Sequence, residues 1–197
     1  PVELAEEVAR LAAERMDRGI VALDLAGNEA QFPMLPFAGV FREARESGLH
    51  ITVHAGEWGG AENIRQAIVD LDAERIGHGV RVLEDPAVLA LVRERQTPLE
   101  VCVTSNYQSG AVPALHDHPL PRLVDAGLNV TLNTDDPSIS NICLSDEYRL
   151  VLGDFDLSPG VLKQCILNGA RASFLPEAQS RALESNLDRV LKASLHA

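Results

Sequence analysis

The chain has 197 residues, of which 46% are hydrophobic and 4% aromatic, and it carries a formal net charge of −12 at pH 7. The negative charge, with no run of Lys and Arg to offset it locally, excludes nucleic acid as a partner. The length and the apolar content predict one domain over residues 1–197, with the Leu, Val, Ile and Ala core that is typical of layered α/β proteins.

Cysteine usage and hydropathy predict a cytoplasmic protein without a membrane segment. The three cysteines, Cys102, Cys143 and Cys165, are widely spaced and include no Cys-x-x-Cys pair, so neither a disulfide framework nor a thiolate zinc site is indicated. No window is apolar over the length that a bilayer requires, and the first residues lack the pattern of a signal peptide.

Hydrophobic periodicity predicts alternating helices and strands along the chain. Residues 2–18 place apolar side chains at helical spacing, opposite Glu and Arg. Residues 19–25 are nearly continuously apolar, which is typical of a strand buried on both faces. The same alternation predicts further helices over residues 36–47, 60–71, 86–95, 119–126, 146–152, 158–172 and 176–195, and further strands over 49–54, 75–77, 99–103 and 129–133.

The five predicted strands start about 24 to 30 residues apart, which suits repeated parallel βα units. Length alone favours an open doubly wound sheet, because an eight-stranded barrel takes about 250 residues. Polar residues nevertheless follow every strand and are not confined to one switch point, an arrangement that is typical of barrel enzymes. We therefore predict an α/β fold that forms part of a TIM (β/α)8 barrel.

Each predicted strand ends in residues capable of chemistry. The five tails are residues 24–29, 54–57, 77–79, 104–106 and 133–137. Because the carboxyl ends of parallel barrel strands lie at the same face, we expect these tails to converge on one mouth.

Histidine and carboxylate side chains in these tails predict a divalent metal site. Both are common ligands of catalytic zinc, although they also suit other divalent ions. A Glu three residues beyond a ligand His can transfer protons beside the metal, and His54 and Glu57 have this spacing. Of the adjacent Asp135 and Asp136, one can bind metal while the other accepts a hydrogen bond from a substrate. The alternatives are ordinary hydrogen-bonded histidines and, for residues 135–137, a turn or helix cap.

A second histidine pair, in His116-Asp117-His118, also has the H-x-H spacing of a metal motif. It lies in a predicted loop before Pro119 and not at the end of a strand, so a sheet would not position its ring nitrogens. We interpret this segment as a loop that leads into the next helix.

Together the strand tails resemble adenosine deaminases of the amidohydrolase type. The matching segments are Leu-Ala-Gly-Asn-Glu at 25–29, Val-His-Ala-Gly-Glu at 53–57, Arg-Ile-Gly-His-Gly at 75–79, Leu-Glu-Val-Cys at 99–102, Thr-Ser-Asn at 104–106 and Leu-Asn-Thr-Asp-Asp-Pro at 132–137. They follow the family's order, and the resemblance covers essentially the whole chain. It implies a (β/α)8 barrel with one zinc ion, which deaminates adenosine and deoxyadenosine hydrolytically and releases inosine or deoxyinosine and ammonia.

The resemblance also implies roles for particular residues. His54 and Asp135 would be zinc ligands. Glu57 would protonate N1 of the purine, so that C6 becomes electrophilic, and His78 would orient the attacking water and help to remove its proton.

Two further positions would contact a purine nucleoside, the small-molecule partner that the resemblance implies. Asp136 would form a hydrogen bond at N7, and the backbone N–H of Gly27 would reach N3.

The resemblance is incomplete at the start of the chain. Members of the family begin with a strand that ends in H-x-H, whose two histidines complete the zinc site, whereas residues 2–18 predict a helix without histidine. The chain is therefore expected to begin just before strand four of the barrel and to contain strands four to eight. Two further histidine ligands would come from the missing segment. That segment could be supplied by a complementary N-terminal fragment, and self-association of the chain is the other possibility that stays open.

Two alternative functions stay open at this point. The first is a related deaminase that acts on adenine or another 6-aminopurine. The second, from a different class, is a noncatalytic truncated module that binds a nucleoside or a partner chain without turnover.

Overall fold

The computed structural model describes residues 1–195. The chain divides into two compact units, Pro1–Thr97 and Pro98–Ala197. Both units alternate strands with helices, as the hydrophobic periodicity predicts. The assignment of one domain to residues 1–197 stays a prediction.

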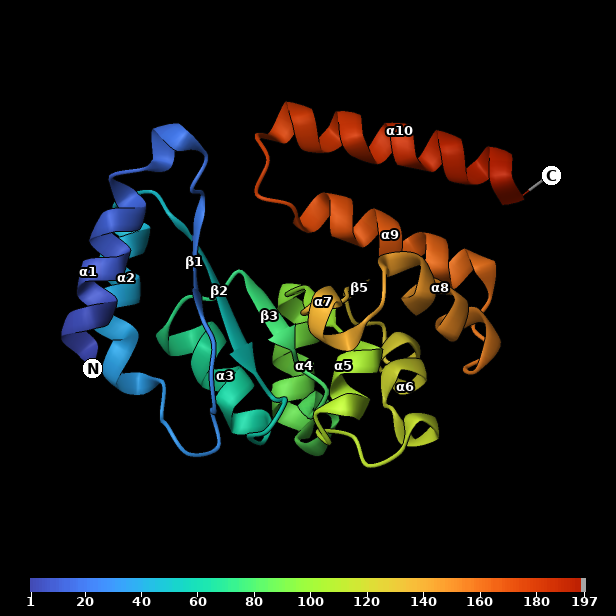
Figure 1. Cartoon of the computed structure of the whole chain (residues 1–197), viewed down its shortest axis with the longest axis horizontal. Coiled ribbons are helices and arrows are strands. Elements are labelled where there is room, and N and C mark those ends of the chain that lie inside the picture. The colour runs from blue at the N-terminus through green and yellow to red at the C-terminus, as the bar shows by residue number, and fades with distance from the viewer. Residues whose placement is uncertain (196–197) are drawn as a thin grey trace. The chain divides into compact units, whose positions relative to one another are not determined.

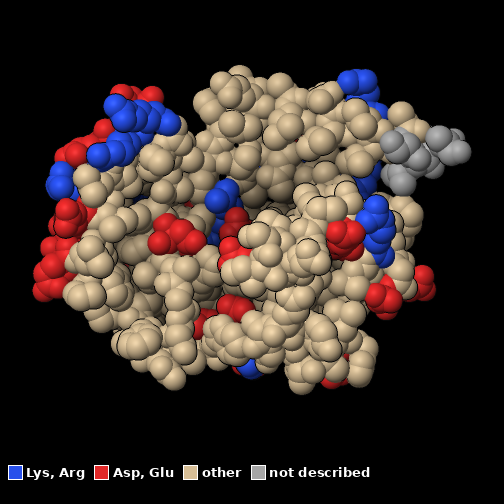
Figure 2. Space-filling model, viewed as in Figure 1, with Lys and Arg blue, Asp and Glu red and all other residues tan. Residues whose placement is uncertain are grey.

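The first unit contains three strands and their helices (Figure 1). Its elements are α1 (Val2–Ala13), η1 (Met16–Arg18), β1 (Ala22–Leu25), η2 (Leu35–Phe37), α2 (Ala38–Glu46), β2 (His50–Ala55), α3 (Ala61–Asp70), β3 (Arg75–His78), η3 (Val82–Glu84) and α4 (Pro86–Arg95). Helix α1 packs against α2, and both α2 and α3 pack against β2. Charged side chains gather over the outer face of α1, at the left of Figure 2.

The three strands of this unit run parallel, in the order β1, β2, β3. Ile51 and Val53 of β2 and Ile76 of β3 are 0% exposed, and alternate residues on a strand and paired residues on neighbouring strands share a face, so these side chains form one apolar face of the sheet. The register pairs Leu25 with Val53 and Ala55 with His78. The carboxyl ends of all three strands therefore lie at one edge of the sheet.

The second unit contains two parallel strands and a larger share of helix. Its elements are β4 (Leu99–Val101), α5 (Val103–Gln108), η4 (Leu115–Asp117), α6 (Leu120–Asp125), β5 (Val130–Leu132), α7 (Pro137–Ser140), α8 (Leu144–Gly153), α9 (Pro159–Ala172) and α10 (Glu177–Leu195). Helix α9 packs on β5, where the side-chain amide of Asn168 donates to the carbonyl oxygen of Val130 at 2.9 Å. Helix α10 packs in turn on α9 (Figure 1).

The five predicted strands all occur, in order, within residues 1–195. Two short helices, α5 and α7, were not predicted, because helices of six and four residues are too short to show a helical period. The predicted end of the fourth strand at residue 103 is wrong, since Val103 already begins α5. The predicted helix over residues 2–18 is interrupted after α1, and Gly19, with φ 92°, ends η1 before the first strand.

Across residues 1–195, no helix is long and apolar enough to cross a membrane.

Candidate active site

Three predicted site residues of the first unit lie at the carboxyl edge of its sheet. His54 is the penultimate residue of β2, Glu57 follows that strand, and His78 ends β3. Because β2 and β3 are parallel and paired through Ala55 and His78, their tails emerge side by side. Parallel pairing therefore brings His54, Glu57 and His78 together, as their positions after consecutive strands predict.

The imidazole of His54 is held by a carboxylate that sequence reasoning had not assigned a role. Its Nδ1 lies 3.2 Å and 3.1 Å from the two carboxylate oxygens of Asp24, on the neighbouring strand β1. Burial raises the pKa of Asp24, but the hydrogen bond and charge of His54 outweigh it, and the net pKa is lowered. A carboxylate bonded to one ring nitrogen is the usual way in which a metal-binding histidine is oriented.

A glycine makes room for the His54 ring. Gly77 is the β3 residue paired with His54, and a Cβ atom at position 77 would lie 3.0 Å from the ring. Such contacts are tighter than side chains normally accept, so the glycine lets the ring lie over the neighbouring strand.

Glu57 and His78 form the second contact of the site. Glu57 Oε2 lies 3.4 Å from His78 Nε2, and these side chains are only 13% and 2% exposed. The rings of His54 and His78 meet edge to face, with centroids 5.2 Å apart. His78 adopts φ 65°, a left-handed conformation that costs a non-glycine residue energy and that is concentrated at functional sites.

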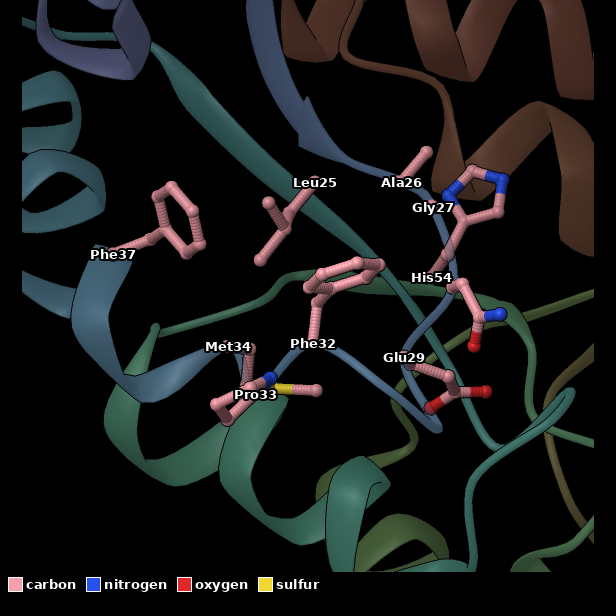
Figure 3. A pocket seen from close by; sticks show the side chains of 10 residues that line it. Leu25, Ala26, Gly27, Glu29, Phe32, Pro33, Met34, Phe37 and His54 are labelled. Carbon is pink, nitrogen blue, oxygen red and sulfur yellow. The ribbon is translucent and has the colours of Figure 1, made fainter. Parts of the chain in front are cut away.

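A largely apolar cavity of about 200 Å³ lies beside these residues (Figure 3). Figure 3 shows the side chains of Leu25, Phe32 and Met34 around it, with His54 and Glu29 at its other side. Gly27 lines the same cavity with φ 131°, a conformation essentially restricted to glycine, so its main chain faces the cavity without a side chain. The complete lining is Leu25, Ala26, Gly27, Asn28, Glu29, Phe32, Pro33, Met34, Phe37 and His54.

The two predicted aspartates belong to the second unit. Asp135 is exposed, adopts φ 56° and accepts a 2.7 Å hydrogen bond from the Ser105 hydroxyl at its Oδ2. Asp136 occupies the N-cap position of α7, as the helix-cap alternative requires, but within residues 1–195 its side chain makes no capping hydrogen bond. The carboxylate of Asp136 therefore does not cap the helix.

A buried carboxylate supports the segment that contains Ser105. Glu147, on α8, is 0% exposed and accepts hydrogen bonds from the backbone N–H groups of Val103 (3.0 Å) and Thr104 (3.1 Å). Burial raises the pKa of Glu147, and these hydrogen bonds oppose the increase. Glu147 was not predicted from the sequence, because nothing in the sequence distinguishes it from its acidic neighbours on an amphipathic helix.

The segment His116-Asp117-His118 leads into α6, as interpreted from the sequence. His116 is in η4, whereas His118 is buried and its Nδ1 accepts a hydrogen bond from the N–H of Leu120 at 3.1 Å. Burial lowers the pKa of His118 to about 4. The two histidines are thus in different environments and do not share a ligand site.

Candidate metal ligands are divided between the two units, with His54 in the first and Asp135 in the second. Within residues 1–195, no group of three or more His, Cys, Asp or Glu residues is placed to hold a metal ion. The donors that are present, an oriented imidazole and a carboxylate, are of the types that zinc binds.

The family model for adenosine deaminase matches residues 1–190. This chain belongs to the adenosine deaminase family. The adenosine deaminase of Klebsiella pneumoniae is 45% identical over 187 residues, which cover 95% of this chain and 55% of the relative. The adenosine deaminase of Salmonella typhimurium is 42% identical over 182 residues, or 92% of this chain and 54% of the relative. The chain thus spans about half the length of these curated family members.

Solved structures of deaminases share the fold of this family member. An adenine deaminase from Arthrobacter aurescens superposes with a TM-score of 0.87 at 32% identity, covering 95% of this chain and 58% of that one. Arabidopsis ADAL complexed with IMP gives a TM-score of 0.86 at 27% identity, covering 98% of this chain and 56% of that one. The predicted family and the predicted partial α/β barrel are confirmed, whereas the six residue roles stay predictions.

Proposed function

We propose that this chain forms part of a zinc-dependent enzyme that deaminates adenosine and deoxyadenosine hydrolytically. The observation that carries the proposal is the grouping of His54, Glu57 and His78 at one sheet edge, beside the cavity that Gly27 lines. Membership of the adenosine deaminase family and 45% identity to a bacterial adenosine deaminase support this substrate class.

The reaction replaces the 6-amino group of the purine by oxygen. Glu57 donates a proton to N1, which draws electron density from C6 and makes it open to attack. His78 accepts a proton from the attacking water as the C6–O bond forms, and this proton passes to the 6-amino group. The C6–N bond then breaks and ammonia leaves, while the remaining hydroxyl proton returns to Glu57 as the C6 carbonyl forms. The buried environment of His78 excludes bulk water from this proton transfer.

The purine would be held by main-chain and carboxylate contacts. The N–H of Gly27 is assigned to N3, and the carboxylate of Asp136 is assigned to N7. The apolar side chains that line the cavity beside Gly27 suit a flat, weakly polar ring.

His54 and Asp135 are the proposed zinc ligands, and Asp24 orients the first of them. Zinc, when bound, supplies Lewis-acid activation of the attacking water. Two further histidine ligands, which the family resemblance implies, would come from outside residues 1–197.

The test uses the full protein that contains this chain, with its metal content measured alongside the absorbance change from adenosine to inosine. Glu57→Gln is expected to lower kcat by roughly 10² to 10⁴-fold, because general acid–base catalysis is lost. Glu62→Gln on α3 is the matched control, since Glu62 is exposed and pairs with Arg65 on its own helix. Wild-type protein that binds zinc but leaves adenosine unchanged would contradict the proposal.

A second candidate substrate class is adenine, because the Arthrobacter aurescens neighbour is an adenine deaminase. Comparing kcat/KM for adenosine, deoxyadenosine and adenine separates the two. A preference for the free base over both nucleosides would replace the proposed substrate, and turnover of none of them, without bound metal, would favour the noncatalytic module.

A further inference from the structure

The tail of β1 contains a carboxylate that contacts the loop after β2. Glu29 is half-buried, and its two oxygens accept hydrogen bonds from three consecutive backbone N–H groups. Oε2 accepts from Gly56 at 2.9 Å, while Oε1 accepts from Glu57 at 2.6 Å and from Trp58 at 2.8 Å. Consecutive N–H groups that converge on one anion form a compact, charge-assisted arrangement.

Asn63 on α3 also holds Glu29. Its side-chain amide donates to Glu29 Oε2 at 2.9 Å and to the Glu29 carbonyl oxygen at 3.3 Å. Gly59 leaves room for this contact, because a Cβ atom there would overlap the Asn63 amide and lie 3.0 Å from Glu29 Oε2. The backbone N–H groups of residues 56–58 and the Asn63 amide therefore determine where the Glu29 carboxylate lies and how its oxygens are oriented.

The other side of the loop is held by Arg81. Its Nε donates to the carbonyl oxygen of Glu57 at 3.0 Å, and its backbone N–H donates to the carbonyl oxygen of Gly56 at 3.1 Å. The main chain of Glu57 is thus fixed at its N–H by Glu29 and at its carbonyl by Arg81. Its side chain points to His78, 3.4 Å away.

From this geometry we infer that Glu29 is a positioning residue, which sets where the carboxyl group of Glu57 lies relative to the purine. The inference rests on the proposed function, in which Glu57 is the proton donor. Glu29 acts through the loop backbone. Gln is nearly isosteric with Glu but presents an NH2 group to one set of N–H donors, so Glu29→Gln removes at least one acceptor while preserving volume.

The experiment compares Glu29→Gln with Glu62→Gln in the full, metal-loaded protein. Two quantities are measured, the steady-state constants for adenosine and the hydrogen-exchange rates of the amides at residues 56–58. We expect Glu29→Gln to accelerate exchange at these amides and to lower kcat about 10 to 100-fold, with KM changed less than about twofold. Glu62→Gln should alter neither quantity.

Asn63→Ala serves as a second, milder variant in case Glu29→Gln does not fold. It removes one donor to Glu29 and leaves the three backbone donors, so it should produce a smaller decrease in kcat of the same kind. Unchanged exchange and unchanged kcat in a folded Glu29 or Asn63 variant would overturn the inference, as would a loss confined to KM. If wild-type protein does not deaminate adenosine, the proposed function fails, and exchange at residues 56–58 still decides whether Glu29 holds the loop.

Discussion

At the scale of single residues, the site depends on what surrounds each imidazole. His54 has a carboxylate partner, Asp24, and a glycine beneath its ring, whereas His78 is almost fully buried and faces Glu57. His78 and Asp135 both adopt left-handed conformations, which neighbouring structure must hold in place.

In the full protein, Gly77→Ala should disturb the proposed zinc binding without unfolding the chain. The added Cβ would press on the His54 ring and displace it from Asp24, so we expect zinc affinity to fall about 10 to 100-fold. Competition with a chelator measures the affinity, and circular dichroism checks the fold.

Gly39→Ala is the matched control for this substitution. A Cβ at position 39, within α2, meets nothing within 4 Å. It should leave zinc affinity unchanged and raise stability by about 0.5–1 kcal/mol, because Ala is the better helix former. Equal zinc affinity in Gly77→Ala and wild type would show that the glycine is not needed for the ring.

At the scale of elements, short polar segments after strands are held by side chains from elsewhere in the same unit. Glu29, from the tail of β1, binds the loop after β2, and Glu147, from α8, binds the segment after β4. Before α6, His118 supplies a similar contact with an imidazole nitrogen. Glu147 and His118 satisfy backbone N–H groups at the starts of α5 and α6, whereas Glu29 satisfies N–H groups of a loop.

His118 should make the stability of the chain depend on pH. Its folded pKa, about 4, lies below the ordinary value of 6.5, because burial disfavours the charged ring. The unfolded chain therefore takes up the proton first, and stability present above pH 6.5 is lost as the pH falls toward 4. The full difference corresponds to about 3 kcal/mol.

Urea unfolding between pH 7 and pH 4 measures this effect against matched variants. The stability loss should be smaller in His118→Gln than in wild type. His116→Gln should behave like wild type, because the His116 side chain is 84% exposed. Identical pH profiles for His118→Gln and wild type would refute the assignment.

At the scale of the whole molecule, charge is the dominant property beyond the site. The net charge of −12 means that acidic side chains repel one another over the surface, although many exposed ion pairs, such as Arg65 with Glu62, relieve this locally. Exposed pairs contribute little to stability, so the excess of like charge prevails.

Added salt should therefore stabilise the purified chain. Raising NaCl from low to moderate concentration screens repulsion beyond about 10 Å, and a gain of about 1 kcal/mol would raise Tm by roughly 2–4 °C. Differential scanning calorimetry across a salt series provides the measurement. A steady decrease in Tm would instead show that the ion pairs outweigh the net charge.

The sequence by itself determined the order of the strands, the family, and the residues at the strand ends. These follow from local patterns, since buried parallel strands are continuously apolar and their polar tails are short and distinctive. The tertiary structure alone decided which side chains hold those tails. Asp24, Glu29 and Glu147 act across 28 to 44 residues of sequence, and only strand register and helix packing bring them to His54, Glu57 and Val103. The short helices α5 and α7 were missed because helices of six and four residues are too short to show a helical period.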